Sequence, residues 1–324
     1  MITRRGLVAT GGALAAAGGL AACDRLTGGQ QQAASKDVVS AAGKAPATAP
    51  AAAPTPGAPA PAFTPNPNWT KDAFEAAMAA SGRPTQISQA VFDAIQARKP
   101  AALATIERYL TAHFGAADPG VMAAFQAIPR EYYHYAYAQK QSQAALAYEA
   151  NAKPWPLGFG SVLSDYLGQA YMTQLAAPKP GETTLEIGTG SGFQSSLLSR
   201  MASQSYSIEI IEPIGRAVDQ IWKPLGYDNI QGRVGDGYFG WPEVKEGFDI
   251  IIVTCVAQYA PPELFRQLKP GGRLLIPIGQ PFRRGQVLYV YTKDAEGKVH
   301  SRRDVGVFFI PMTGAMQKNP PPTA

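Results

Sequence analysis

The stretch Leu185-Glu186-Ile187-Gly188-Thr189-Gly190-Ser191-Gly192 decides the fold of this chain. A short apolar run, 183–187, leads into three glycines at alternate positions, and Leu197, Leu198 and Met201 then recur on one helical face. This succession of strand, tight turn and helix is typical of the first unit of a nucleotide-binding α/β domain. Glycines suit such a turn because backbone approaches a ligand closely only where no Cβ intervenes.

The spacing of the glycines and a neighbouring carboxylate argue against a dinucleotide ligand. Gly188, Gly190 and Gly192 follow the pattern G-x-G-x-G, whereas dinucleotide sites use G-x-G-x-x-G. Glu186 precedes the first glycine by two residues and would repel a pyrophosphate, but it would attract a ligand that carries an ammonium and a sulfonium. The sequence therefore predicts an S-adenosylmethionine site that includes Glu186 and the three glycines.

Two more acidic residues follow the next two apolar runs. Glu209 ends the second run, where a carboxylate can bind both hydroxyls of a ribose. Asp236 lies in Val234-Gly235-Asp236-Gly237 after the third run and can accept a hydrogen bond from an adenine amino group. We include Gly237 in the candidate site. The alternative interpretation is a glycine triplet that forms only a turn, but acids after successive strands favour a cofactor site.

Strand-like and helix-like segments alternate over the C-terminal half. This alternation predicts a doubly wound α/β sheet whose ligands bind at the carboxyl ends of the strands. The expected strands are 183–187, 205–209, 229–234, 249–254, 272–277 and 286–292, with an edge strand within 305–311, and the expected helices are 192–203, 213–226 and 258–269.

The preceding region is predicted to be helical. Apolar residues recur at helical spacing, and Asp118-Pro119 is a typical helix start. Helices are expected at 72–80, 85–98, 101–114, 119–128 and 166–176. The prolines and glycines of 153–160 predict a loop, which is well placed to lie over the ligand.

The first residues resemble an export signal. Thr3-Arg4-Arg5-Gly6-Leu7 is a twin-arginine pattern, and Leu20-Ala21-Ala22-Cys23 resembles a bacterial lipoprotein box. We expect lipidation at Cys23 and a protein anchored to the bacterial membrane on the periplasmic side. The following Ala/Pro-rich stretch to residue 66 has almost no large apolar side chain and predicts a tether. The alternative is a fortuitous Ala-rich N-terminus on a cytoplasmic protein.

The composition indicates neither a nucleic-acid partner nor a metal site. The net charge is +5, and Lys and Arg are scattered along the chain, so no nucleic-acid partner is indicated. With 3 histidines and 2 cysteines, the sequence holds no metal-ligand constellation. Cys255 lies within an apolar run and is interpreted as a small core residue.

From about Arg108 to Gly314 the chain resembles the protein-L-isoaspartate O-methyltransferases. The supporting stretches, in family order, are Ile128-Pro129-Arg130-Glu131-Tyr132, 185–194, Gly235-Asp236-Gly237, 248–254, 267–274, Ile276-Pro277-Ile278-Gly279 and Phe309-Ile310-Pro311-Met312-Thr313-Gly314. The resemblance implies a seven-stranded methyltransferase fold, an S-adenosylmethionine cofactor and methylation of isoaspartyl carboxylates in damaged proteins. A carboxylate is ionised at neutral pH, so the transfer needs positioning and exclusion of water instead of a strong base.

The expected organisation follows from these segments. It comprises a signal peptide (1–22), a lipidated cysteine with its tether (23–66), a helical N-terminal region (67–150), a substrate-side loop and helix (151–177), the S-adenosylmethionine-binding domain (178–314) and a tail (315–324).

The substrate loop departs from the family pattern Gly-x-Gly-Gln-Thr-Ile-Ser-Gln-Pro. The family's serine corresponds to Ser164, to which the resemblance assigns the catalytic role, with a helix N-cap as the alternative. Ser161, Val162 and Tyr166 replace the family's glutamine, threonine and proline. Asp165 adds a negative charge where a carboxylate substrate would arrive.

Two other functions stay open. The altered loop, the additional helices and the export signal suit a membrane-tethered accessory lipoprotein that binds within a membrane-protein complex without isoaspartyl activity. A methyltransferase for a different acceptor is the other, with the aromatic segment 132–137 either lining a second pocket or packing between helices.

Overall fold

The computed structural model describes residues 68–319. The expected signal peptide, the lipidated Cys23 and the tether therefore lie outside the described residues. Within 68–319, no helix has the length and apolar character needed to cross a membrane.

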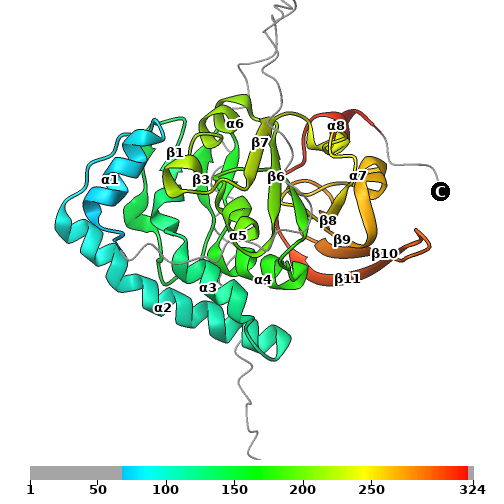
Figure 1. The fold of residues 1–324 in the computed structure, drawn as a ribbon, viewed down its shortest axis with the longest axis horizontal. Helices are drawn as coiled ribbons and strands as arrows, with labels where there is room; N and C mark the ends of the chain where they lie inside the picture. The colour runs from blue at the N-terminus through cyan, green and yellow to red at the C-terminus, as the bar shows by residue number, and fades with distance from the viewer. Residues whose placement is uncertain (1–67, 320–324) are drawn as a thin grey trace, which may run out of the picture. The chain divides into compact units, whose positions relative to one another are not determined.

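A seven-stranded sheet forms the centre of the fold (Figure 1). Its strand order is β11-β10-β9-β8-β5-β6-β7, and neighbours among β7, β6, β5, β8 and β9 are parallel whereas β10 is antiparallel to β9 and β11. This confirms the predicted doubly wound α/β fold. The strands are β5 (Thr183–Ile187), β6 (Gln204–Glu209), β7 (Ile230–Val234), β8 (Phe248–Val253), β9 (Leu268–Ile278), β10 (Gln286–Lys293) and β11 (Val299–Val307).

Side-chain burial follows the position of each strand. Ile250, Ile251 and Ile252 of β8 are all fully buried, because a central parallel strand is covered on both faces. β10 alternates between buried and half-buried residues, as an antiparallel strand with one solvated face does. β11 forms the exposed edge and begins at Val299, six residues before the expected start, because it pairs with the whole length of β10.

Prolines shorten two of the expected sheet helices. The segment 213–226 forms α6 (Glu212–Val218) and a separate 3-10 turn, η3 (Lys223–Leu225), because Pro224 cannot continue an α-helix. The expected helix 258–269 is α7 (Pro262–Gln267), which starts at its proline and runs directly into β9. The other helices of this layer, α4 (Tyr166–Ala176) and α5 (Phe193–Met201), agree with the predicted ranges.

The N-terminal region contains α1 (Lys71–Ala80), α2 (Gln89–Phe114) and α3 (Pro119–Ala127). The two helices expected at 85–98 and 101–114 are one, since α2 continues through Pro100. Proline removes one backbone hydrogen bond. Even so, Phe92, Ile95, Ala102, Ile106 and Leu110 form a single buried stripe along α2, and the burial of this stripe holds the helix together. Ser88 caps α2 by accepting from Val91 N at 3.3 Å.

The expected loop 153–160 is a β-hairpin. Strands β3 (Trp155–Gly158) and β4 (Ser161–Leu163) pair antiparallel across a turn at Phe159 and Gly160. Gly158 has φ +95°, and a Cβ there would lie 2.6 Å from Ala138 Cβ. This close approach admits only glycine, so the glycines indicate a hairpin turn here.

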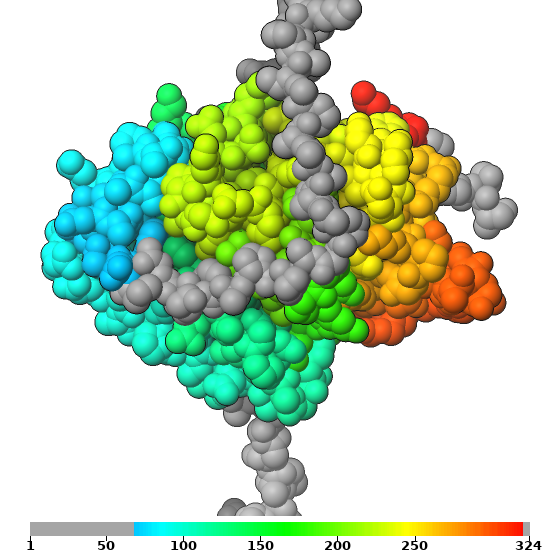
Figure 2. All heavy atoms as spheres, in the orientation of Figure 1, coloured from blue at the N-terminus to red at the C-terminus, as the bar shows by residue number. Residues whose placement is uncertain are grey.

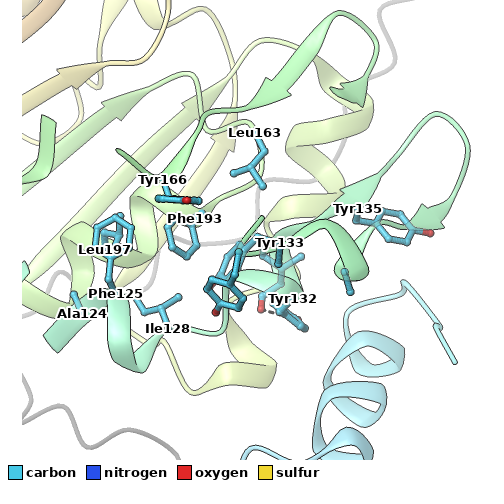
Figure 3. Packing of buried hydrophobic residues seen from close by; sticks show 14 of the residues in the cluster. Ala124, Phe125, Ile128, Tyr132, Tyr133, Tyr135, Leu163, Tyr166, Phe193 and Leu197 are labelled. Atoms are coloured by element: carbon cyan, nitrogen blue, oxygen red, sulfur yellow. Dashed lines mark hydrogen bonds between the residues drawn. The ribbon is translucent and has the colours of Figure 1, made fainter. Parts of the chain in front are cut away.

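The helical region and the sheet helices share one hydrophobic core (Figure 3). Phe125 of α3 and Tyr133 both contact Phe193 of α5, with ring centroids 5.7 and 5.2 Å apart. Tyr132 and Tyr133 are fully buried, so these tyrosines pack between helices instead of lining a second pocket. The short elements around them are η1 (Arg130–Tyr133), β1 (Tyr135–Ala136), β2 (Gln141–Ser142) and η2 (Ala144–Leu146).

The two ends of the described chain lie on opposite sides of the sheet helices. In the space-filling view α1 and α2, coloured blue to cyan, lie opposite β10 and β11, coloured orange to red (Figure 2). The segments from α4 to β7, coloured green to yellow-green, lie between them (Figure 1).

Candidate functional site

The glycine turn after β5 is held in the left-handed backbone conformation at all three glycines. The φ values are +95° at Gly188, +52° at Gly190 and +81° at Gly192. A Cβ at Gly188 would lie 2.6 Å from Thr254 Oγ1, and one at Gly192 would lie 2.8 Å from Val218 Cγ1. Packing alone therefore requires glycine at the first and third positions.

Gly190 differs because its neighbourhood has room for a Cβ. The nearest atoms, Val162 O, Leu157 Cδ1 and Ser161 Oγ, would lie 3.6, 3.7 and 3.8 Å away. All three belong to the β3–β4 hairpin, so the hairpin covers the glycine turn as the sequence predicts. The hairpin therefore lies against the turn at ordinary van der Waals distance from the position that a Cβ would take at Gly190.

Glu209, at the end of β6, is tied to this turn. Its Oε2 accepts from Gly190 N at 2.8 Å, and its Oε1 accepts from Ile211 N at 2.9 Å. Burial raises the pKa of the carboxyl, and these backbone N–H groups oppose the shift. The structure thus brings Glu209 beside the glycines, as expected for parallel strands that end at one edge.

Glu186 lies beneath the turn, between β5 and α5. Its Oε2 accepts hydrogen bonds from Ser207 Oγ at 3.0 Å and from the Ser195 hydroxyl. The residue is 1% exposed, and burial raises its pKa to about 8. The sequence predicts a charge that faces the ligand, whereas the structure has a buried carboxyl that is largely protonated at neutral pH.

Asp236 joins the site to the C-terminal segment. Its Oδ1 accepts from Tyr238 N at 3.0 Å and so caps η4 (Gly237–Phe239), and its Oδ2 accepts from Ala315 N at 2.7 Å at the start of α8 (Ala315–Lys318). A Cβ at Gly237 would lie 2.2 Å from Ile187 Cγ2. Asp236 and Gly237 therefore lie at the same edge of the sheet as the glycine turn.

The C-terminal segment 310–315 crosses this edge of the sheet, a position that the sequence alone did not predict. Val256 N donates to Ile310 O and Met312 N donates to Val256 O, both at 2.8 Å. Cys255 lies next to this pairing and is buried; burial first, and then the Glu209 and Asp236 carboxylates, raise the pKa of its thiol. The thiol therefore stays protonated, which agrees with its interpretation as a core residue.

Ser164 precedes α4 and is not its N-cap, so that alternative is wrong. The N-cap is Asp165, whose Oδ1 accepts from Leu167 N at 3.0 Å and from Gly168 N at 2.8 Å. The Asp165 carboxylate is thus engaged by the positive end of its own helix instead of facing a substrate. Ser164 lies two residues after Val162, whose backbone oxygen would lie 3.6 Å from a Cβ at Gly190.

Possible metal ligands are not clustered in the part of the chain that the structure describes. No group of three or more His, Cys, Asp and Glu residues within 68–319 is arranged to hold an ion.

Comparisons with known proteins agree on one family. The family model described as Protein-L-isoaspartate(D-aspartate) O-methyltransferase matches residues 105–317. Protein-L-isoaspartate O-methyltransferase 1 of Nitrosospira multiformis is 37% identical over 249 residues, which cover 76% of this chain and 99% of that protein. Protein-L-isoaspartate O-methyltransferase 1 of Cupriavidus necator is 43% identical over 199 residues, or 61% of this chain and 73% of that protein.

Solved structures give the same result for the fold. A protein-L-isoaspartate O-methyltransferase structure matches with a TM-score of 0.58 and 25% identity, covering 67% of each chain. A putative protein-L-isoaspartate O-methyltransferase from Plasmodium falciparum, in complex with S-adenosyl-L-homocysteine, has a TM-score of 0.52 and 21% identity, covering 64% of this chain and 97% of that one.

The buried Glu186 predicts a specific pH dependence of stability. Its carboxyl holds a proton up to about pH 8 in the folded chain, against a usual value of 4.5, so it destabilises the fold as pH rises between these values. Glu186→Gln should therefore gain stability relative to the natural chain from pH 5 to pH 8, by up to about 1.4 kcal/mol per pH unit. Urea unfolding across this range measures the difference, with Glu212→Gln as the exposed control. A difference that stays constant with pH contradicts the prediction.

Proposed function

Because this chain belongs to the protein-L-isoaspartate O-methyltransferase family, we propose that it transfers a methyl group from S-adenosylmethionine to isoaspartyl carboxylates in damaged proteins. The observation that carries this proposal is the glycine turn itself, in which the β3–β4 hairpin lies over Gly190 and the Gly190 amide donates to Glu209.

The residues at this edge fit the cofactor. Each Glu209 oxygen accepts one backbone hydrogen bond and retains a lone pair for a ribose hydroxyl. Asp236 can accept from the adenine amino group, and Gly188, Gly190 and Gly192 let the backbone approach the ligand. Glu186 supports the turn from below. When bound, S-adenosylmethionine supplies an electrophilic methyl group on its sulfonium.

The residues of this chain have three tasks in the transfer. The acceptor carboxylate is ionised at neutral pH, so no residue has to remove a proton from it. The β3–β4 hairpin lies over Gly190 and would keep water from a cofactor bound at the turn. We assign to Ser164 the orientation of the acceptor carboxylate, through a hydroxyl that neither donates to nor accepts from any residue of the described chain.

The accessory-protein alternative loses one of its supports. Asp165 caps α4, so its charge no longer argues against a carboxylate substrate. The substitutions at Ser161, Val162 and Tyr166, the additional N-terminal helices and the export signal stay as its basis.

Methyl transfer to a synthetic isoaspartyl peptide tests the proposed function. The full chain should methylate this peptide at saturating S-adenosylmethionine and leave the same peptide with normal aspartate unmodified. Ser164→Ala should lower kcat roughly ten- to a hundredfold, because removal of an orienting contact acts in the transition state. No transfer by the folded natural chain would support the accessory-protein alternative.

Gly190→Ala separates ligand binding from folding. A methyl group at Gly190 meets no atom within 3.6 Å and adds only the strain of a left-handed alanine, about 1 kcal/mol, so the variant should fold. It should lose at least tenfold in S-adenosylmethionine affinity, measured by calorimetric titration, because the methyl group would keep the ligand from approaching the backbone of the turn. Gly192→Ala is the contrasting variant and should unfold readily. Unchanged affinity in Gly190→Ala would argue against a cofactor bound at this turn.

We also propose that the chain is exported and anchored to the bacterial membrane by a lipid on Cys23. The supporting residues are the arginine pair, the lipoprotein-like box and the tether that precedes the described fold. The tether would hold the catalytic domain near the membrane and any protein complex there.

Fractionation of cells tests the anchor. The natural chain should sediment with membranes, and Cys23→Ser should move to the supernatant because it has no thiol to lipidate. Cys255→Ser, at the other cysteine, should stay with the membranes. Membrane association that survives Cys23→Ser contradicts the proposed anchor.

A further inference from the structure

Arg130 is a buried arginine without an ion pair in the described chain. It is 2% exposed, and its Nη1 donates to Gln169 Oε1 at 2.5 Å. Its Nη2 donates to the backbone oxygen of Ser164 at 2.6 Å. Burial lowers its pKa to about 10, which leaves the guanidinium charged at neutral pH. A buried charge is unfavourable unless its hydrogen bonds compensate, and here one of them holds the backbone of the proposed catalytic serine.

The same guanidinium contacts the helix that follows the glycine turn. Its central carbon lies 4.8 Å from the ring centroid of Phe193, the first residue of α5, and 5.8 Å from that of Tyr166. Figure 3 shows these two rings next to each other in the core. Since Phe193 directly follows Gly192, Arg130 touches both the cofactor side and the acceptor side of the candidate site.

The charge of Arg130 is balanced at a distance. The negative charge of Asp165 raises the pKa of the Arg130 guanidinium and so opposes the lowering by burial. The same carboxylate accepts the hydrogen bonds that cap α4. Nη1 and Nη2 therefore stay with Gln169 and Ser164, which fixes the end of the hairpin against α4, whereas the buried Nε has no hydrogen-bond partner among the described residues. A planar guanidinium suits this role because its donors have a fixed fork geometry.

We propose that Arg130 is a positioning residue for methyl transfer, which fixes the Ser164 backbone relative to the first turn of α5. It thereby sets the separation between the acceptor carboxylate and the cofactor. This inference rests on the proposed function.

Arg83 provides a matched control. It is also 2% exposed, donates from Nε to Ser81 Oγ at 3.0 Å and from Nη1 to Tyr132 O at 2.9 Å, and packs on the Tyr132 ring at 4.3 Å. None of these bonds reaches the hairpin or the glycine turn. A purely structural role for buried arginines predicts the same behaviour for both residues.

The experiment compares Arg130→Met, Arg130→Lys and Arg83→Met in the full chain. Both methionine variants should keep S-adenosylmethionine affinity within about threefold. Only Arg130→Met should lose at least tenfold in kcat on the isoaspartyl peptide, with a smaller change in KM, because the acceptor is misplaced in the transition state. Arg130→Lys should have an intermediate kcat, because an ammonium can replace only part of the fork. If Arg130→Met does not fold, Arg130→Lys decides alone, with a fivefold loss supporting the inference.

Amide hydrogen exchange supplies a readout that needs no turnover. The backbone amides of residues 161–168 should exchange faster in Arg130→Met than in the natural chain. In Arg83→Met their exchange rates should equal those of the natural chain. A natural chain without methyl transfer contradicts the proposed function, and the exchange rates then still decide the role of Arg130. Three outcomes would each overturn the inference. They are unchanged amide exchange at residues 161–168 in Arg130→Met, a kcat equal to that of the natural chain in either Arg130 variant, and a loss of kcat in Arg83→Met as large as that in Arg130→Met.

Discussion

The turn that follows β5 is the constraint on which the rest of the structure depends. Thr254 Oγ1 donates to the backbone oxygen of Gly188 at 2.6 Å, and Val218 and Ile221 pack against the position of Gly192, so neither glycine tolerates a side chain. Thr254 directly follows β8, and Val218 and Ile221 belong to the segment after β6. The ends of β5, β6 and β8 lie at the same level, because Ile187 is paired with both Ile208 and Val253. Once this level is set, Gly190 lies at the edge with its amide directed to Glu209.

Buried acids support this turn, and their partners explain how the fold tolerates them. Glu186 accepts from two serine hydroxyls and Glu209 from two backbone amides, which compensates for their removal from water. Burial nevertheless raises the pKa of both carboxyls, that of Glu186 to about 8. Glu186 therefore supports the turn as an acceptor for two serine hydroxyls more than as a negative charge.

The sequence predicted most elements of the sheet correctly because their signals are local. The apolar run of β8 and the alternation of β10 reflect burial on two faces and on one face. Errors arose where long-range packing overrides a local signal. Pro100 suggested a break, but the continuous buried stripe keeps α2 intact. The glycines of 158–160 suggested an irregular loop, whereas contact with Ala138 makes them a hairpin turn.

By itself, the sequence determined the doubly wound fold, the glycine turn, the acids after β6 and β7 and the family. Tertiary structure alone decided that Glu186 is buried beneath the turn, that Asp165 and not Ser164 caps α4, and that the segment 310–315 crosses the edge. It also placed Arg130 against Ser164 and Asp236 against Ala315. The physical reason is distance along the chain: patterns of apolar residues report burial within one element, whereas a hydrogen bond between remote elements exists only after the core has packed.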